Sequence, residues 1–291
     1  MEERTPLTEP RYAHEYSQRL VEAARRVLID VGQVLASFRD VVVVVGGWVP
    51  ELLLAGQPPH SGSIDLDLAL NSQKLADGRY AELLELLLQT RRYRLGDQEF
   101  QLVTDVDLQD GGPTIQVEVE FLAPQQPRLR GKSRVEGFRV LQFPECAAAF
   151  TAPEEVAIEG AMLKGGFTTV RWLVVALPDF LILKAAALDR RDKPKDAYDL
   201  CYCLEHWPGG LSQAARDFRT RLECEQTRLT AQQAVTILRL RFETPAHYGP
   251  AQYAEFFAPF DDPDENDIAR QRAFHLVAGL LEHLEELTRE E

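Results

Sequence analysis

The part of the sequence that decides the fold reads VVVVVGGW over residues 41–48 and, after a polar loop, SIDLDL over residues 63–68. Five consecutive valines are typical of a strand that is buried on both faces of a sheet. Gly46 and Gly47 permit a tight turn and let a ligand approach the backbone. The segment Val49–Ala55 predicts a short helix, whose first amide groups would face an anion. We therefore predict a buried strand that turns through two glycines into an anion-binding helix start.

The second stretch predicts a short strand, Ser63–Leu70, with two carboxylates on one face. Residues i and i+2 of a strand project from the same face, so Asp65 and Asp67 would lie close together. Two carboxylates held that close repel each other, and their burial would be costly. A divalent cation between them removes this cost, and hard oxygen ligands suit Mg²⁺ or Mn²⁺. The pattern indicates a metal-dependent phosphoryl- or nucleotidyl-transfer site beside the glycine turn.

A third carboxylate is expected from the strand that reads IQVEVEFL over residues 115–122. Alternation places its apolar side chains on one face and Glu118 and Glu120 on the other. Glu120 or Glu118 would reach the same metal and accept the proton of an attacking hydroxyl. Asp105 and Asp107 share the spacing of the first pair, but no glycine turn precedes them. We therefore expect these two on the exposed face of a hairpin.

The hydrophobic pattern predicts mixed α/β structure up to about residue 177 and mostly helices beyond it. In the first part we expect helices at 12–38, 49–55 and 79–90, strands at 41–45, 63–70, 101–108 and 114–122, and further short strands within 154–177. In the second part we expect helices at 179–190, 195–205, 211–224, 230–242 and 268–287. The predicted domains are residues 1–177 and residues 178–291.

Composition and charge exclude several classes of protein. With 291 residues, of which 45% are hydrophobic and 27% charged, the chain is neither collagen-like nor wholly disordered. Its apolar runs fall far short of the ~20 residues that a membrane helix needs. The net charge of −14 argues against a general nucleic-acid coat but permits a local basic cleft. The four cysteines form neither a C-x-x-C pair nor a dense disulfide framework, so we expect a cytoplasmic protein.

Taken together, these motifs resemble the DNA polymerase β-like nucleotidyltransferase superfamily. The resemblance lies in the order Gly-Gly, Ser-x-Asp-x-Asp-Leu and Val-Glu-Phe-Leu. A later stretch, LKAAALDRRDKPKDAYDL over residues 183–200, is similar to the Lys…Ala-Leu-x-x-Arg…Lys-Asp-x-x-Asp-Leu pattern of the AbiEii/AbiGii-type toxin nucleotidyltransferases. The resemblance covers about residues 38–206. It implies a mixed sheet with flanking helices, an α/β (α+β) fold, followed by a mostly helical C-terminal domain.

The resemblance also implies a role for each motif residue. Asp65, Asp67 and Glu120 would hold two metal ions, and Glu120 is preferred to Glu118 because Phe-Leu-Ala-Pro follows it as in relatives. The nucleotide would bind Gly46, Gly47, Ser63, Lys184, Lys195 and Asp196. Lys184 is also assigned a catalytic role, through contact with the triphosphate or the acceptor.

Other positions near these motifs have less defined roles. Asp199 would help Lys195 and Asp196 to organise the helical side of the cleft. Relatives often carry arginine four residues before the first metal-binding aspartate, whereas this chain has Ser61 there. The neighbouring His60 is expected to be a loop residue rather than a ligand.

The expected function is transfer of an NMP from an NTP to an acceptor hydroxyl. The toxin resemblance suggests an RNA end, such as a tRNA acceptor stem, as the acceptor and an antitoxin protein as the partner. The basic stretch 128–139 would be a solvated loop or a contact to an RNA backbone. Two alternatives stay open: an enzyme that modifies a small molecule or a protein, which the negative net charge favours, and a non-catalytic nucleotide-binding relative.

Overall fold

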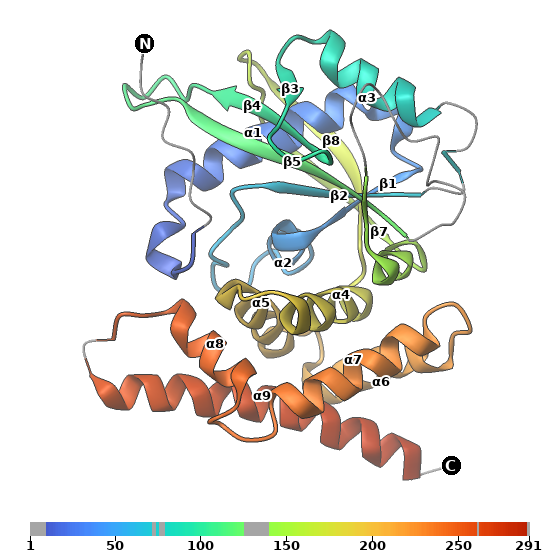
Figure 1. Cartoon of the computed structure of the whole chain (residues 1–291), viewed down its shortest axis with the longest axis vertical. Helices are drawn as coiled ribbons and strands as arrows, with labels where there is room; N and C mark the ends of the chain where they lie inside the picture. Colours follow the sequence, from blue (N-terminus) through green and yellow to red (C-terminus); the bar gives the residue numbers. More distant parts are fainter. Residues whose placement is uncertain (1–9, 72–73, 76–78, 125–139, 261, 290–291) are drawn as a thin grey trace.

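The computed structural model describes residues 10–71, 74–75, 79–124, 140–260 and 262–289 (Figure 1). A mixed sheet with helices around it makes up the first part of the chain, and a group of helices makes up the rest. The predicted α/β fold with a helical C-terminal region is therefore confirmed. The basic stretch 128–139 lies outside the described residues.

The sheet has the strand order β3-β4-β5-β2-β1-β8-β7, and β6 pairs with β5. Its strands are β1 (Val42–Val45), β2 (Leu66–Leu70), β3 (Tyr93–Leu95), β4 (Gln101–Val106), β5 (Ile115–Ala123), β6 (Leu141–Gln142), β7 (Glu154–Ala161) and β8 (Phe167–Val174). Strand β1 is antiparallel to β2 and parallel to β8, and β2 is parallel to β5. Every residue of β1 is buried, as an uninterrupted valine run at the centre of a sheet requires.

The helices occupy two regions of the molecule. They are α1 (Gln18–Val34), α2 (Val49–Leu53), α3 (Arg79–Gln89), α4 (Leu177–Arg190), α5 (Pro194–Glu205), α6 (Gly210–Glu223), α7 (Arg228–Arg241), α8 (Tyr248–Phe256) and α9 (Pro263–Arg289). Helix α1 packs on β2, β5, β7 and β8. Helices α4 and α5 lie between the sheet and the outer helices α6 to α9 (Figure 1). None of the described helices is long and apolar enough to span a bilayer.

One hydrophobic core runs from the sheet into the helical region. Val44 of β1, Phe121 of β5, Phe180 of α4 and Phe256 of α8 are all nearly inaccessible to solvent and belong to the same cluster. The change from strands to helices falls at Leu177, where α4 begins. The division into two domains at that point stays a prediction.

Several predicted boundaries were wrong. The helix expected at 12–38 is limited to α1, flanked by short 3-10 turns. The strand expected at 63–70 begins only at Leu66, so Asp65 lies one residue before it. Strands β3 and β6 and helix α8 were not predicted, and α9 begins at Pro263 rather than at residue 268. Proline fits the first turn of a helix because the amide group it lacks would have no partner there.

Candidate active site

The glycine turn forms directly at the end of the buried strand β1. Gly46 has a φ of +70°, and a 3-10 turn over Gly46–Trp48 leads into α2. A Cβ atom added to Gly46 would overlap the carboxylate of Asp67, and one added to Gly47 would overlap the hydroxyl of Ser63. The backbone of the turn therefore lies directly against the side chains of the Ser63–Asp67 segment, which only glycine permits.

The predicted carboxylates meet at this turn. In the sheet, Asp67 is the register partner of Val45 in β1 and of Glu120 in β5. Ser63 Oγ donates a hydrogen bond to Asp65 Oδ1 over 2.6 Å. The indole Nε1 of Trp48 donates to the carbonyl oxygen of Asp65 over 2.8 Å, which ties the loop to the turn. The structure thus brings Asp65 and Asp67, at the start of β2, close to Glu120 of the neighbouring strand β5.

The three carboxylates differ in how well their charges are compensated. Burial opposes ionisation of Asp65, but Lys193, the Ser63 hydroxyl and further lysines hold its pKa below the ordinary value. Burial and the charge of Asp65 raise the pKa of Asp67 to about 7. Burial, Asp67 and Asp65 raise the pKa of Glu120 to about 8. Negative charge at Asp67 and Glu120 is therefore under-compensated by the protein itself.

These carboxylates fit a divalent cation by their chemistry. They are hard oxygen donors whose mutual repulsion a cation would relieve. Among the described residues, no three His, Cys, Asp or Glu side chains already form a compact metal-holding cluster. Glu120 Oε1 instead accepts a hydrogen bond from Gln101 Nε2 over 3.2 Å. The assignment of Asp65, Asp67 and Glu120 as metal ligands stays a prediction.

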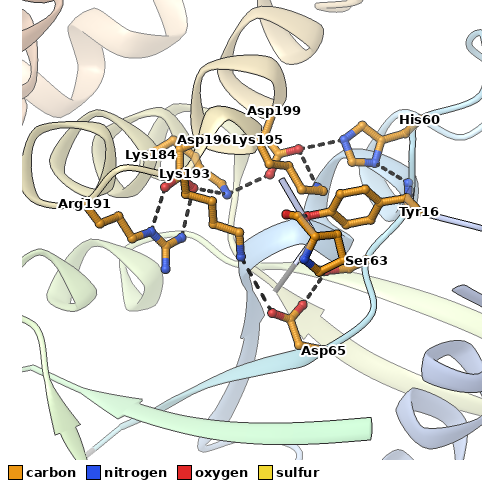
Figure 2. Close-up of polar contacts among 12 residues, drawn as sticks. Tyr16, His60, Ser63, Asp65, Lys184, Arg191, Lys193, Lys195, Asp196 and Asp199 are labelled. Atoms are coloured by element: carbon orange, nitrogen blue, oxygen red, sulfur yellow. Dashed lines mark hydrogen bonds and ion pairs between the residues drawn. The ribbon is translucent and has the colours of Figure 1, made fainter. Parts of the chain in front are cut away.

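Helices α4 and α5 face the carboxylates with a buried network of charges (Figure 2). Lys184 Nζ lies 2.8 Å from Asp196 Oδ1 and 2.7 Å from Asp199 Oδ2. Lys195 Nζ lies 2.6 Å from Asp199 Oδ1, and Arg191 Nε lies 2.7 Å from Asp196 Oδ2. The four motif residues Lys184, Lys195, Asp196 and Asp199 therefore form ion pairs mainly with one another. Arg191 adds a further ion pair to this group, at Asp196.

The charges of this network follow from its pairing. Burial would lower the pKa of Lys184, but Asp196 and Asp199 raise it above the ordinary value. Burial lowers the pKa of Lys195, although Asp199 opposes the effect. Despite burial, the neighbouring cations depress the pKa of Asp196 and of Asp199. Both aspartates are therefore ionised over the neutral pH range.

A cavity joins the carboxylates to the network. The volume of the cavity that the centre of a water molecule can occupy is about 20 Å³. It is lined by Tyr16, Gly47, Ser63, Ile64, Asp65, Asp67, Lys184, Arg191, Lys193, Lys195 and Asp199. Lys193 Nζ approaches Asp65 Oδ2 to 4.0 Å across it (Figure 2). Of the predicted nucleotide-binding residues, Gly47, Ser63, Lys184 and Lys195 line this cavity, whereas Gly46 and Asp196 do not. The predicted metal ligand Glu120 is not part of the lining either.

Sequence reasoning missed two contributors to the site. Tyr16 comes from the segment before α1, and its ring lies 5.5 Å from Lys195 Nζ. His60 was expected to be a loop residue rather than a ligand; its side chain is inaccessible to solvent, and its Nε2 lies 2.9 Å from Asp199 Oδ1. Ser61, at the position where relatives often carry arginine, donates its backbone N–H to Tyr198 Oη over 3.0 Å. The partners of Tyr16, His60 and Ser61 are all residues of α5, far away in the sequence, so no local sequence signal could have predicted these contacts.

Asp105 and Asp107 lie elsewhere. Both are exposed, and Asp105 forms an ion pair with Arg94 of β3 over 3.0 Å. The expectation that this second Asp-x-Asp pair lies on an exposed hairpin face is confirmed.

Comparison with solved structures finds distant similarities. Among solved structures, MenT4, a nucleotidyltransferase toxin from Mycobacterium tuberculosis H37Rv, shares 15% identity over 91% of this chain and 89% of its own, with a TM-score of 0.39. JHP933 from Helicobacter pylori shares 12% identity over 94% and 97%, with a TM-score of 0.43. An antigenic nucleotidyltransferase-like protein from Paracoccidioides brasiliensis shares 17% identity over 73% and 93%, with a TM-score of 0.37.

No curated protein sequence matches the chain. The family model described as nucleotidyl transferase AbiEii toxin, type IV TA system, matches residues 31–276. That match includes the glycine turn, the carboxylate strands and the charged network of α4 and α5. The chain therefore belongs to the AbiEii family of nucleotidyltransferase toxins from type IV toxin–antitoxin systems.

Proposed function

We propose that this AbiEii-family enzyme transfers an NMP from an NTP to an acceptor hydroxyl at the cavity between the glycine turn and α5. The observation that carries the proposal is the contact between the turn and the carboxylates, because a Cβ atom at Gly46 would overlap Asp67. Backbone amides that bind phosphate would then lie next to carboxylates that bind the metal of a nucleotide. That juxtaposition is what nucleotidyl transfer requires.

Asp65 and Asp67 would hold the metal, Mg²⁺ or Mn²⁺, and Glu120 is the third carboxylate. When bound, the metal supplies positive charge that stabilises the oxygens of the reacting phosphate and of the leaving pyrophosphate. The register pairing of Glu120 with Asp67, and the effect of both aspartates on its pKa, favour it over Glu118. Glu120 is the carboxylate that we assign to accept the proton of the attacking hydroxyl.

The cations of the helical side would hold the triphosphate. Lys184 and Lys195 are buried and ion-paired, so we assign them to fixing the network and the positive potential of the cavity wall. Arg191 and Lys193 lie on the loop between α4 and α5 and also line the cavity. We assign contact with the phosphates first to these two residues. Gly46, Gly47 and Ser63 would bind the phosphates from the opposite side.

We propose an RNA end as the acceptor and a cognate antitoxin as the partner of the enzyme. Membership of a type IV toxin family supports both assignments. Arg191 and Lys193, the cavity-lining cations of the α4–α5 loop, also suit a polyanionic acceptor despite the net charge of −14. A small molecule or a protein is the alternative acceptor, which the negative overall charge favours.

The test is incubation of the full chain with each α-labelled NTP, Mg²⁺ and total RNA. We compare wild type with Asp67→Asn, and use Asp107→Asn as the matched control from the exposed Asp-x-Asp pair. We expect labelled RNA from wild type and Asp107→Asn, and a loss of about 100-fold or more in Asp67→Asn. Label on protein or on a small molecule would support the alternative acceptors. Equal transfer by Asp67→Asn would refute the proposed site.

A further inference from the structure

The buried imidazole of His60 joins the loop before the carboxylates to helix α5. Its side chain is inaccessible to solvent. Nε2 lies 2.9 Å from Asp199 Oδ1, and Nδ1 lies 3.1 Å from the backbone nitrogen of Gly62. The ring also stacks on Tyr198, with ring centres 5.0 Å apart, and meets the edge of Tyr202 at 4.8 Å. His60 therefore contacts both the loop before the carboxylates, at Gly62, and helix α5, at Asp199.

Its hydrogen bonds determine which ring nitrogen carries the proton. A backbone N–H can only donate, so Nδ1 must accept from Gly62 and carries no proton. Nε2 then carries the single proton of a neutral imidazole and donates it to the ionised Asp199. Burial and the charge of Lys195 also lower the pKa of His60 to about 4. A second proton would break the bond with Gly62 and add a buried charge.

Other side chains of α5 hold the same loop through its backbone. Tyr202 Oη donates to the carbonyl oxygen of Pro58 over 2.6 Å, and the N–H of Ser61 donates to Tyr198 Oη. His60 lies between Pro58 and Ser61 in the sequence, and its side chain connects the loop to the charged network through Asp199. The loop continues directly into Ser63 and Asp65, so its position on α5 decides where the first carboxylate lies relative to Lys193 and Lys195.

We propose that His60, as the neutral Nε2–H tautomer, is a positioning residue for nucleotidyl transfer. It fixes the Pro58–Ser63 loop on α5 and, through the same ring, orients Asp199 so that its two oxygens face Lys184 and Lys195. The role in transfer rests on the proposed function, whereas the clamp between loop and helix does not. His60 is not among the residues that line the cavity, and the carboxylate that it contacts is that of Asp199, so it acts through the groups that it holds.

The test separates the two hydrogen bonds with conservative substitutions in the full chain. His60→Asn keeps an acceptor near the position of Nδ1, and His60→Gln keeps a donor near the position of Nε2. His60→Ala removes both. The control is His206→Ala, because the ring of His206 packs on the same Tyr202 with ring centres 4.5 Å apart. Thermal unfolding shows which variants fold, and the asparagine and glutamine variants carry the test if the alanine variant does not.

We expect kcat for NMP transfer to fall about 10-fold or more in His60→Ala, with KM for the NTP changed less than about 3-fold. His60→Asn and His60→Gln should each recover part of kcat, and His206→Ala should match wild type. If His60 only filled space, the losses would follow side-chain volume, and His60→Leu, which matches asparagine in shape but has no hydrogen-bonding group, would recover as much kcat as His60→Asn. That result would overturn the positioning role.

Two measurements do not depend on activity. Backbone amide exchange at residues 61–63 should be about 10-fold faster in His60→Ala and His60→Gln than in wild type, but not in His60→Asn. Imidazole ¹⁵N spectra near neutral pH should show a protonated Nε2 and an unprotonated Nδ1 for His60. Unchanged amide exchange at residues 61–63 in His60→Ala, or a protonated Nδ1 in wild type, would overturn the proposed clamp between loop and helix. If wild type transfers no label, the proposed function fails while these two measurements still decide on the clamp.

Discussion

Asp67 and Glu120 show how proton binding links this site to folding. In the unfolded chain an aspartate ionises near its ordinary pKa of about 4. In the folded chain, burial and Asp65 raise the pKa of Asp67 to about 7, and burial and the two aspartates raise that of Glu120 to about 8. The folded state therefore binds these protons more tightly than the unfolded state. The resulting stability is fully present below about pH 4 and is lost as the pH rises through 7 to 8.

This linkage predicts that Asp67→Asn flattens the pH dependence of stability. In metal-free protein, the unfolding temperature of wild type should fall between pH 5.5 and pH 8.5 by at least about 3 °C more than that of Asp67→Asn. The amide cannot ionise, so it escapes the repulsion from Asp65 and Glu120. Differential scanning calorimetry measures both curves.

The exposed carboxylate of Asp107 supplies the control for that experiment. Asp107→Asn should follow the wild-type curve over the whole pH range, because Asp107 is exposed and an asparagine side chain can still accept the hydrogen bond that Gln109 N–H donates to it over 2.8 Å. Mg²⁺ added at pH 8 should raise the unfolding temperature of wild type and of Asp107→Asn but not that of Asp67→Asn. Parallel curves for wild type and Asp67→Asn would mean that the carboxylate of Asp67 is already compensated.

Sequence could identify some residues of the site and not others. Asp65 and Asp67 could be predicted because two local signals coincide, the Asp-x-Asp spacing and the double glycine before it. His60 could not, because its partner Asp199 is 139 residues away and nothing nearby distinguishes it from a solvated loop histidine. The pairing of Lys184 with Asp196 and Asp199 was not predicted either, although Asp196 is only 12 residues away, because this pairing depends on how α4 packs against α5.

At the scale of elements, predictability follows the strength of the hydrophobic pattern. Strands β1 and β5 could be predicted because one is a run of valines and the other alternates strictly between buried and half-buried residues. Strand β6 has only two residues and exists through its pairing with β5, so no periodicity indicates it. Helix α8 begins with Tyr248-Gly249-Pro250, and glycine and proline are typical of turns, which hid its start.

The turn between β1 and α2 gives a prediction with a matched control. Gly46→Ala places a Cβ atom on the Asp67 carboxylate at a φ of +70°, so we expect transfer activity to fall about 100-fold or more. Gly56→Ala has the same kind of backbone strain, with a φ of +91°, but open space around the new atom. It should cost about 1 kcal/mol of stability and leave kcat unchanged.

Comparing the two glycine variants separates backbone strain from overlap with the carboxylate. Chemical denaturation measures their free energies of unfolding, and the labelled-NTP assay measures transfer. If Gly46→Ala loses stability but keeps wild-type kcat, then transfer does not depend on the close approach between the glycine turn and the Asp67 carboxylate. If Gly56→Ala loses activity as well, strain near α2 rather than overlap explains both variants.

At the scale of the whole molecule, the described residues before α1 connect the cavity with the α4–α5 loop and with α8. Arg11 Nε lies 2.6 Å from Glu255 Oε1 of α8, and Arg11 Nη2 lies 3.1 Å from Asp192 Oδ2 in the α4–α5 loop. Tyr16 Oη donates to the carbonyl oxygen of Pro10, and the Tyr16 ring lines the cavity. The N-terminal segment thus bridges the loop and the outer helices across the site.

The cavity is narrow, so we expect this arrangement to move aside when a nucleotide binds. The space open to the centre of a water molecule is about 20 Å³, which holds roughly one water molecule. The ion pairs of Arg11 are partly exposed, with about a third of its side-chain surface accessible. Such pairs contribute about 0.2–1 kcal/mol each, so their loss shifts the balance towards the open state only modestly.

Arg11→Ala should therefore bind NTP more tightly, not less. We expect the Kd for a non-hydrolysable NTP with Mg²⁺, measured by titration calorimetry, to fall about 2- to 5-fold. Arg19→Ala is the control, because Arg19 forms an equally short ion pair with Asp110, 2.7 Å away, but does not line the cavity. Its Kd should equal that of wild type. A rise in Kd for Arg11→Ala would mean that the segment contributes to nucleotide binding instead of competing with it, because a cover that must move aside can only weaken binding.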